Sequence, residues 1–160
     1  VFFVVTPAGD RGSVIANIDA TIVGGEFHTL VVTGNENEGT GQLSVDDRRK
    51  VPAYALFTVT NGSTKVGSLD VYVVEPGHAI DAASPNLRQL SQTPSDFSVQ
   101  ALGLDGGTYD LVLARGNTKD VLFGPRRIDV AAGGIYSLFL TDVTGRGGEP
   151  IDLVYGDDFR

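Results

Sequence analysis

The dominant pattern along the chain is an alternation of apolar and polar residues, which predicts β-strands buried on one face. In the segment 68–74, for example, Leu69, Val71 and Val73 share one face, whereas the other carries Asp70. The segments of the second part of the chain that are predicted as strands are 53–60, 68–74, 96–102, 108–114, 120–123, 126–131, 135–142 and 150–155. Turn signals separate them, and short strands at this spacing predict an all-β fold, an antiparallel immunoglobulin-like two-sheet sandwich.

The end of the chain resembles a stretch near its beginning, at a separation of about 110 residues. The segment 24–32 matches a later one in a way that places His28 opposite Ser137. A separation of this size is typical of a small β-domain. We therefore expect residues 50–160 to form one complete β-sandwich module and residues 1–49 to be the C-terminal part of a truncated module.

The expected truncation of the N-terminal part indicates which partners the chain would have. The chain begins with Val1 and contains no methionine, so its N-terminus is expected to have been cut away. The strands of 1–49 would then lack half of their sandwich, and their apolar faces and edges would need a cover. The predicted partners are neighbouring modules of the same protein, or a second copy of the chain in a homo-oligomer through the uncovered strands.

One segment departs from the alternation. Residues 79–93 are mostly polar, with Pro85 inside the segment and Pro94 directly after it. This composition predicts a long crossover between the sheets, with one helical turn at 86–90.

Composition narrows the class of protein. The chain of 160 residues has 21 glycines, no cysteine, no tryptophan and a net charge of −8. Without cysteine it has neither a disulfide framework nor a thiolate metal site. The negative charge is spread along the chain and repels phosphate backbones and anionic lipid, which argues against nucleic acid as a partner. The apolar run 1–5 is far too short to span a bilayer, so no direct membrane insertion is expected.

Several motifs occur in a recognisable order. The segment 69–73 reads LDVYV and is followed by Pro76-Gly77, 107–112 reads GTYDLV, and 128–138 reads IDVAAGGIYSL before a final acidic pair at 157–158. In order and spacing they resemble the domain of unknown function 4397 family, repeated β-sandwich modules found mainly in exported or surface-attached bacterial proteins. The resemblance implies a periplasmic, cell-surface or extracellular location. It implies neither catalytic residues nor a cofactor.

The loop 34–41 carries the best candidate for a metal site. Asn35, Asn37 and Asp46 stand at relative positions 1, 3 and 12 of a calcium-binding loop, where oxygen donors on alternate residues converge on a hard cation. Gly39 occupies position 5, where a further ligand is needed. An acidic, glycine-rich hairpin tip is therefore the favoured interpretation.

The acidic pairs Asp46-Asp47 and Asp157-Asp158 are a second candidate for chemistry. Adjacent residues of a strand point to opposite faces, so the two carboxylates of one pair diverge. We therefore predict a structural role for them in a turn or at a junction between modules.

The remaining candidates have plain structural interpretations. His28 is interpreted as an outward-facing strand residue and His78 as a turn residue. The residues 61–63 match a glycosylation sequon but are predicted to form a turn. Tyr72, on the face opposite Val71, is the candidate platform for a sugar ring.

No nucleophile–base pair, hydrolase elbow or metal cluster is visible in the sequence, so no enzymatic activity is expected. The predicted function is that of a non-enzymatic β-sandwich module of an exported or cell-surface bacterial protein, a structural or adhesin-like scaffold without a cofactor. The alternative is a carbohydrate- or calcium-binding module that uses its inter-strand loops.

Overall fold

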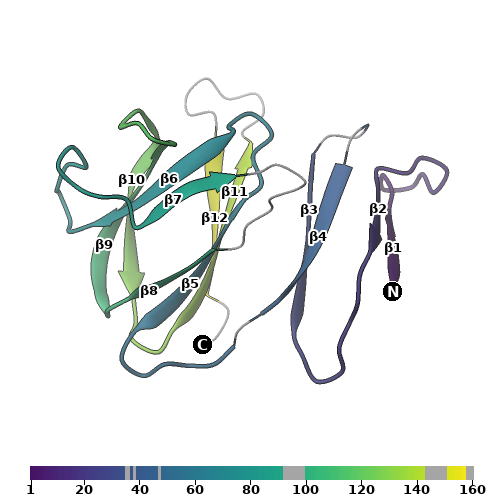
Figure 1. Cartoon of the computed structure of the whole chain (residues 1–160), viewed down its shortest axis with the longest axis horizontal. Helices are drawn as coiled ribbons and strands as arrows, with labels where there is room; N and C mark the ends of the chain where they lie inside the picture. Colours follow the sequence, from purple (N-terminus) through teal and green to yellow (C-terminus); the bar gives the residue numbers. More distant parts are fainter. Residues whose placement is uncertain (35–36, 38, 47, 92–99, 143–150, 158–160) are drawn as a thin grey trace. The chain divides into compact units, whose positions relative to one another are not determined.

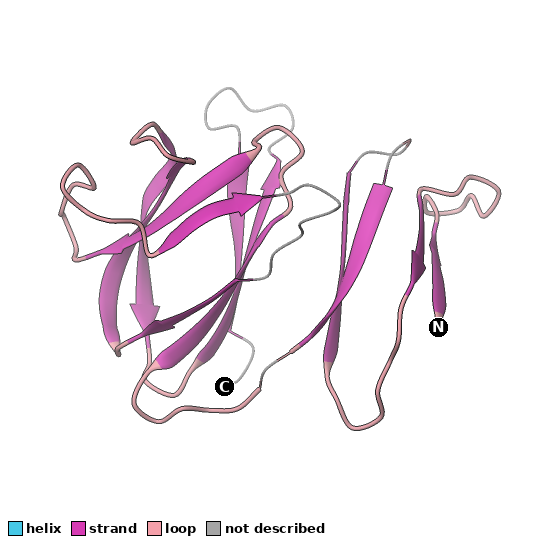
Figure 2. Cartoon of the chain, viewed as in Figure 1, coloured by secondary structure: helices cyan, strands magenta, loops and turns pink. Residues whose placement is uncertain are grey.

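The computed structural model describes residues 1–34, 37, 39–46, 48–91, 100–142 and 151–157. The chain divides into two compact units, Val1–Arg49 (unit 1) and Lys50–Arg160 (unit 2). All regular elements in the described residues are strands, so the prediction of an all-β fold is confirmed (Figure 2). Within the same residues there is no helix long and apolar enough to cross a membrane.

Unit 2 is a sandwich of two four-stranded sheets, as predicted (Figure 1). One sheet has the order β10-β9-β6-β7, and the other has the order β12-β11-β5-β8. The strands are β5 (Ala55–Asn61), β6 (Ser68–Val74), β7 (Leu87–Ser91), β8 (Gln100–Leu104), β9 (Gly107–Arg115), β10 (Val121–Val130), β11 (Ile135–Asp142) and β12 (Ile151–Asp157). The two short strands predicted at 120–123 and 126–131 are joined in β10, which pairs with β9 through two register shifts.

The strand β11 lies between the first and the last strand of unit 2. It pairs with β5 in parallel, with Ile135 beside Leu56, and this is the one parallel ladder among the described strands. It pairs with β12 antiparallel, with Tyr136 beside Asp157. The beginning of β5 and the end of β12 therefore lie at the same end of β11.

Alternate residues of both sheets fill the space between them. Phe57 and Val59 of β5 and Leu138 and Leu140 of β11 are almost fully buried, and they belong to one cluster with Leu111 of β9. The alternation in the sequence predicts these faces. Each such side chain contributes about 1.5–3 kcal/mol by leaving water.

The connection 75–86 between β6 and β7 covers the outer face of its sheet. Ile80 in this connection joins Tyr72 in a second, smaller apolar cluster. The Lys119 ammonium lies 4.4 Å from the centre of the Tyr72 ring and donates hydrogen bonds to the carbonyls of Ile80 and Ala83. This cation therefore fixes the connection to the sheet.

The helical turn predicted at 86–90 is wrong, because most of this segment belongs to the strand β7. The side-chain oxygen of Asn86 accepts a hydrogen bond from the Val73 amide at 2.7 Å, and the Asn86 amide donates to the Val71 carbonyl at 2.8 Å. These bonds align the chain with β6 before the strand begins. Asparagine competes for backbone partners in this way, which overrides a weak helical pattern.

Unit 1 consists of two hairpins, β1 (Phe2–Val5) with β2 (Ala16–Asp19) and β3 (His28–Gly34) with β4 (Gly39–Val45). The hairpins pack on each other through β2 and β4. Gly39 and Gly41 face β2, and a Cβ atom at either position would collide with the side chain of Ile15 or Ile18. The two glycines therefore permit the close approach of β4 to β2.

A turn of the same type occurs in both units. In unit 1 the Glu26 amide donates to the Val23 carbonyl around Gly25, whose φ is 87°. In unit 2 the Gly134 amide donates to the Ala131 carbonyl around the glycine at 133, whose φ is 76°. Both turns need a glycine at their third position because of the positive φ. They precede β3 and β11, respectively.

Counting from this turn shifts the match proposed from the sequence by one residue. Gly25 corresponds to Gly133, so His28 corresponds to Tyr136 and not to Ser137. A shift of one residue moves a strand side chain to the other face. Accordingly, the side chain of His28 is only 8% exposed, and the prediction that it faces outward is wrong.

Candidate functional site

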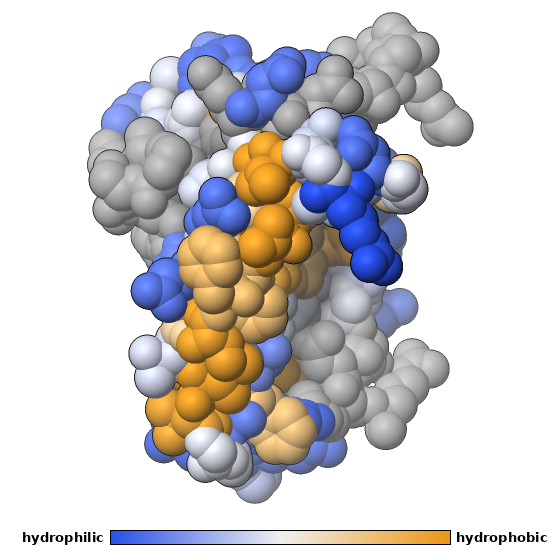
Figure 3. All heavy atoms as spheres, turned by 90° about the vertical axis from the view of Figure 1, so that its right-hand side faces the viewer, coloured by the Kyte–Doolittle hydropathy of each residue, from blue (hydrophilic) through white to orange (hydrophobic). Residues whose placement is uncertain are grey.

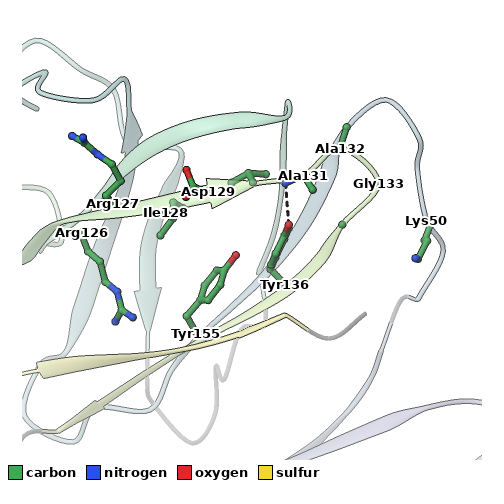
Figure 4. Close-up of a pocket in the computed structure, with 12 residues that line it drawn as sticks. Lys50, Arg126, Arg127, Ile128, Asp129, Ala131, Ala132, Gly133, Tyr136 and Tyr155 are labelled. Carbon is green, nitrogen blue, oxygen red and sulfur yellow. Dashed lines mark hydrogen bonds between the residues drawn. The ribbon is translucent and has the colours of Figure 1, made fainter. Parts of the chain in front are cut away.

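A hollow of unit 2 lies beside β10 and β12, the edge strands of the two sheets (Figure 4). Its volume is about 600 Å³. The lining comes from β10, from the turn that follows it, from Tyr136 of β11, from Tyr155 of β12, and from Lys50. The hollow therefore exists only because the sandwich brings the two edge strands together.

Three stacked aromatic rings lead from the core to this hollow. The rings of Phe57 and Tyr136 have centroids 4.7 Å apart, and those of Tyr136 and Tyr155 are 5.5 Å apart. The Tyr136 hydroxyl accepts a hydrogen bond from the Ala131 amide at 3.0 Å. Gly134 leaves room for the Tyr136 ring, because a Cβ atom there would come within 2.5 Å of it.

Arg126 and Tyr155 are the side chains best placed to meet a ligand. Figure 4 shows both on the same side of β10, whereas Arg127 points to the other side. Arg126 donates a hydrogen bond from Nη1 to the Leu153 carbonyl at 3.0 Å, which orients its guanidinium group. Arg126 and Tyr155 together offer positive charge and an aromatic ring, a combination suited to a sugar with a carboxylate.

The Arg127 guanidinium serves the fold. It donates to the Asp110 carboxylate from Nε at 2.9 Å and from Nη2 at 3.1 Å. The same carboxylate accepts a hydrogen bond from the Gly77 amide at 2.7 Å. These bonds, first those from Arg127 and then that from Gly77, lower the pKa of Asp110.

A second carboxylate closes the turn between β5 and β6. Asp142 at the end of β11 accepts hydrogen bonds from the Ser63 hydroxyl, from the Thr64 amide and hydroxyl, and from the Lys65 amide. Burial opposes ionisation of this carboxyl group, but the hydrogen bonds outweigh it and lower its pKa. Asn61, in the same turn, donates from Nδ2 to the carbonyls of Gly67 and Leu90. The Asn61 side chain is buried and its amide nitrogen donates both of these hydrogen bonds, so the sequon at 61–63 does not expose an asparagine for glycosylation.

Acid is expected to destabilise unit 2 through Asp110 and Asp142. Both carboxyl groups have a folded pKa below the ordinary value of 3.8, so their contribution to stability is fully present above that pH. It is lost as the pH falls through the folded pKa values. Urea unfolding between pH 6 and 2 should show a falling midpoint below about pH 4. The fall should be weaker in the double variant Asp110→Asn, Asp142→Asn. An equally steep fall in this variant and in the wild-type protein would contradict the assignment.

The proposed calcium ligands do not form a described site. Asn35 lies outside the described residues, and Asn37 is exposed at the hairpin tip. The Asp46 carboxylate accepts a hydrogen bond from the Thr29 hydroxyl at 2.9 Å, across the β3–β4 hairpin. Among the described residues there is no group of three or more His, Cys, Asp or Glu side chains that could hold a metal ion.

The acidic pairs are only partly described. Asp47 and Asp158 lie outside the described residues, as does the side chain of Asp157. For Asp46, the Thr29 bond and the hydrogen bond from its own amide to the Phe27 carbonyl fit the structural role predicted from the sequence.

Tyr72 is not a platform for a sugar ring. Only 1% of its surface is exposed, because the connection 75–86 and Lys119 cover it. His78 is exposed in a turn, with Nδ1 3.7 Å from the Glu75 carboxylate. The sequence pattern identified the outer face of β6 correctly but did not show that a loop folds over it.

The sequence analysis did not single out Arg126 and Tyr155, which line the hollow. Neither residue belongs to a sequence motif that marks a ligand-binding group. In the β11–β12 ladder Tyr155 pairs with Leu138. Tyr136 precedes Leu138 by two residues on the same face of β11, so it is the diagonal neighbour of Tyr155. Diagonal pairs of aromatic residues reach each other in such a hairpin, and this spacing was the available signal.

Comparisons with models of protein families, with curated proteins and with solved structures gave no match. The function is therefore argued from the residues and the geometry alone.

Proposed function

We propose that the chain is a non-enzymatic β-sandwich module of an exported or cell-surface bacterial protein, where it serves as a structural or adhesin-like scaffold. The resemblance to the domain of unknown function 4397 family supports the location outside the cytoplasm. An acidic chain suits such a domain, because it is well solvated.

The observation that carries this proposal is the recurrence of one plan in the two units. Each has a hairpin, a turn around a glycine of positive φ, and a second hairpin. A plan repeated along one chain is typical of proteins that extend from a surface by adding modules. The half-buried and buried charges also serve the fold: Asp70, Asp110 and Asp142 each accept hydrogen bonds from backbone amides of turns.

The hollow beside β10 and β12 favours a second candidate function, the binding of an acidic carbohydrate. Tyr155 would stack on a sugar ring, and Arg126 would meet a carboxylate. The other alternative to a scaffold is a calcium-binding module, with Asn35, Asn37 and Asp46 as the ligands.

A thermal-shift screen of the full chain against calcium and against neutral and acidic glycans separates these functions. For a scaffold, the melting temperature is expected to stay constant, and a panel of hydrolase substrates should show no turnover. An acidic glycan that binds in the hollow would raise the melting temperature, and Tyr155→Ala would abolish the rise. Tyr54→Ala, at an exposed tyrosine outside the hollow, is the matched control. A calcium-dependent rise lost in Asn37→Ala would overturn the scaffold proposal in favour of a metal site.

A further inference from the structure

Unit 2 exposes few large apolar side chains. Twelve such side chains are exposed in the described residues, and the three that belong to unit 2 are Tyr54, Val121 and Val154. The other nine belong to unit 1, and in the view of Figure 3 apolar side chains form a continuous strip. In its described residues unit 2 thus offers little apolar contact area, so its open strand edges are the surfaces through which it can join another chain.

Three of the four edge strands of unit 2 have features that discourage pairing. The strands β7 and β8 are each five residues long, and β10 contains Pro125 and pairs with β9 through two register shifts. Short strands, prolines and irregular pairing all make an edge a poor template for a further strand. By contrast, β12 is a strand of seven residues without proline, and its register with β11 is unbroken. It is therefore the edge that most needs another form of protection.

The hydrogen bonds of β11 show which backbone groups of β12 face the open edge. The Leu140 carbonyl accepts a hydrogen bond at 2.9 Å from the amide of Gly62, which directly follows β5. Leu140 therefore directs its backbone groups toward β5, and its pair with Leu153 in the β11–β12 ladder is not hydrogen-bonded. The amide and the carbonyl of Leu153 consequently point away from β11, toward the open edge.

Both of these Leu153 groups are bonded to side chains. The carbonyl accepts the hydrogen bond from Arg126 Nη1 at 3.0 Å, and the amide donates to Asp152 Oδ1 at 2.7 Å. Hydrogen bonds with one charged partner are roughly twice as strong as neutral ones, and a further strand offers only neutral backbone groups in exchange. Figure 4 shows the Arg126 side chain reaching from β10 toward β12, so it also lies in the path of an added strand.

We propose that Arg126 and Asp152 close the edge of β12 to strand addition, and that two copies of unit 2 pair through this edge once both side chains are removed. A strand paired along β12 needs the Leu153 groups, because they lie between those of Ile151 and Tyr155 on the same edge.

The strand that this edge accepts is β12 of a second copy. A two-fold axis turns an identical strand into an antiparallel partner. With Leu153 opposite Tyr155, the two copies of Val154 stand opposite each other, so that two exposed apolar side chains meet. The closed edge keeps units apart where many are held close together. This inference goes beyond the scaffold function and does not depend on it.

Sedimentation of the full chain tests the closed edge. In the double variant Arg126→Ala, Asp152→Ala, the mean mass should rise toward twice that of the wild-type protein at the same concentration. The single variant Asp152→Ala keeps the bond from Arg126 and should give a smaller rise. The matched control Arg115→Ala, Asp120→Ala removes the same two charges from exposed positions outside β10 and β12, and should keep the wild-type mass. Association through the exposed apolar side chains of unit 1 would be common to all these proteins, so the comparison with the wild-type protein isolates β12.

Val154→Lys provides a rescue that a damaged fold would not give. Val154 is 54% exposed on β12, so a lysine is tolerated there. Added to the double variant, it brings two like charges together across the new ladder, which is destabilising. The mean mass should therefore return to the wild-type value.

Amide hydrogen exchange locates the contact. In the double variant the Leu153 amide should exchange more slowly as the concentration rises, because a partner strand covers it, whereas in the wild-type protein its exchange should not depend on concentration. A double variant with the wild-type mass would overturn the proposal. So would a rise in mass that the matched control shares, that Val154→Lys does not reverse, or that leaves the exchange of Leu153 independent of concentration. In each of these cases the association would run through another surface or through unfolded chains.

Discussion

Replacing Phe57 by alanine is expected to lower the free energy of unfolding of unit 2 by about 3–5 kcal/mol. Only 1% of Phe57 is exposed, and its ring stacks on Tyr136 at 4.7 Å. The truncation would leave a cavity between the sheets and remove the support of the aromatic rings that lead to the hollow. The loss should therefore exceed that for any single surface change.

Urea unfolding of the full chain measures this loss. The NMR signals of unit 2 should be used to monitor the unfolding, because the two units need not unfold together. Val154→Ala, on the exposed face of β12, is the control and should change the free energy of unfolding by less than about 0.5 kcal/mol. A loss below about 1 kcal/mol for Phe57→Ala would mean that the sheets close over the cavity.

Replacing Asp142 by asparagine should cost unit 2 about 1.5–3 kcal/mol. The carboxylate accepts hydrogen bonds from the side chain or backbone of Ser63, Thr64 and Lys65. An amide at this position keeps one acceptor oxygen, but it loses the charge and turns an NH₂ group toward donors. The turn between β5 and β6 would then be left with unsatisfied groups.

The matched control is Asp120→Asn, the same chemical change at an exposed carboxylate. It should leave the urea midpoint nearly constant at pH 7. Lowering the pH from 7 to 2 favours protonation of the Asp142 carboxyl, so the difference in stability between the wild-type protein and Asp142→Asn should shrink. An equal difference at both pH values would show that the effect is steric and not due to charge.

The alternation of apolar and polar residues was sufficient to predict the sandwich of unit 2. The inward faces follow directly from it, as in Leu69 and Val71 of β6 or Leu138 and Leu140 of β11. This works because one face of each strand is buried and the side-chain period is two. The pattern does not contain the strand order, and the parallel ladder of β5 and β11 could not be read from it.

The errors have different physical origins, a backbone conformation in one case and a contact between distant parts of the chain in the other. His28 was assigned to the wrong face because Gly24-Gly25 can be matched to Gly133-Gly134 by letters, whereas only φ shows which glycines are equivalent. Tyr72 lies on an outer face, as expected, but Lys119 and the connection after β6 cover it.

The hollow could not be predicted for the same reason. Arg126 and Tyr155 come from different sheets and meet only where the two edge strands lie beside each other. Neither residue has a neighbour in the sequence that marks it as a ligand-binding group.

The position of β11 between β5 and β12 determines how unit 2 responds to a pulling force. Tension applied through the start of β5 and the end of β12 acts at one end of β11, where Leu56 lies beside Ile135 and Asp157 beside Tyr136. The two strands that flank β11 would peel away from this end, one ladder bond at a time, and the load would not be shared by the whole ladder. Such a unit yields at low force and lengthens gradually. A row of them would be an extensible tether, not a rigid rod.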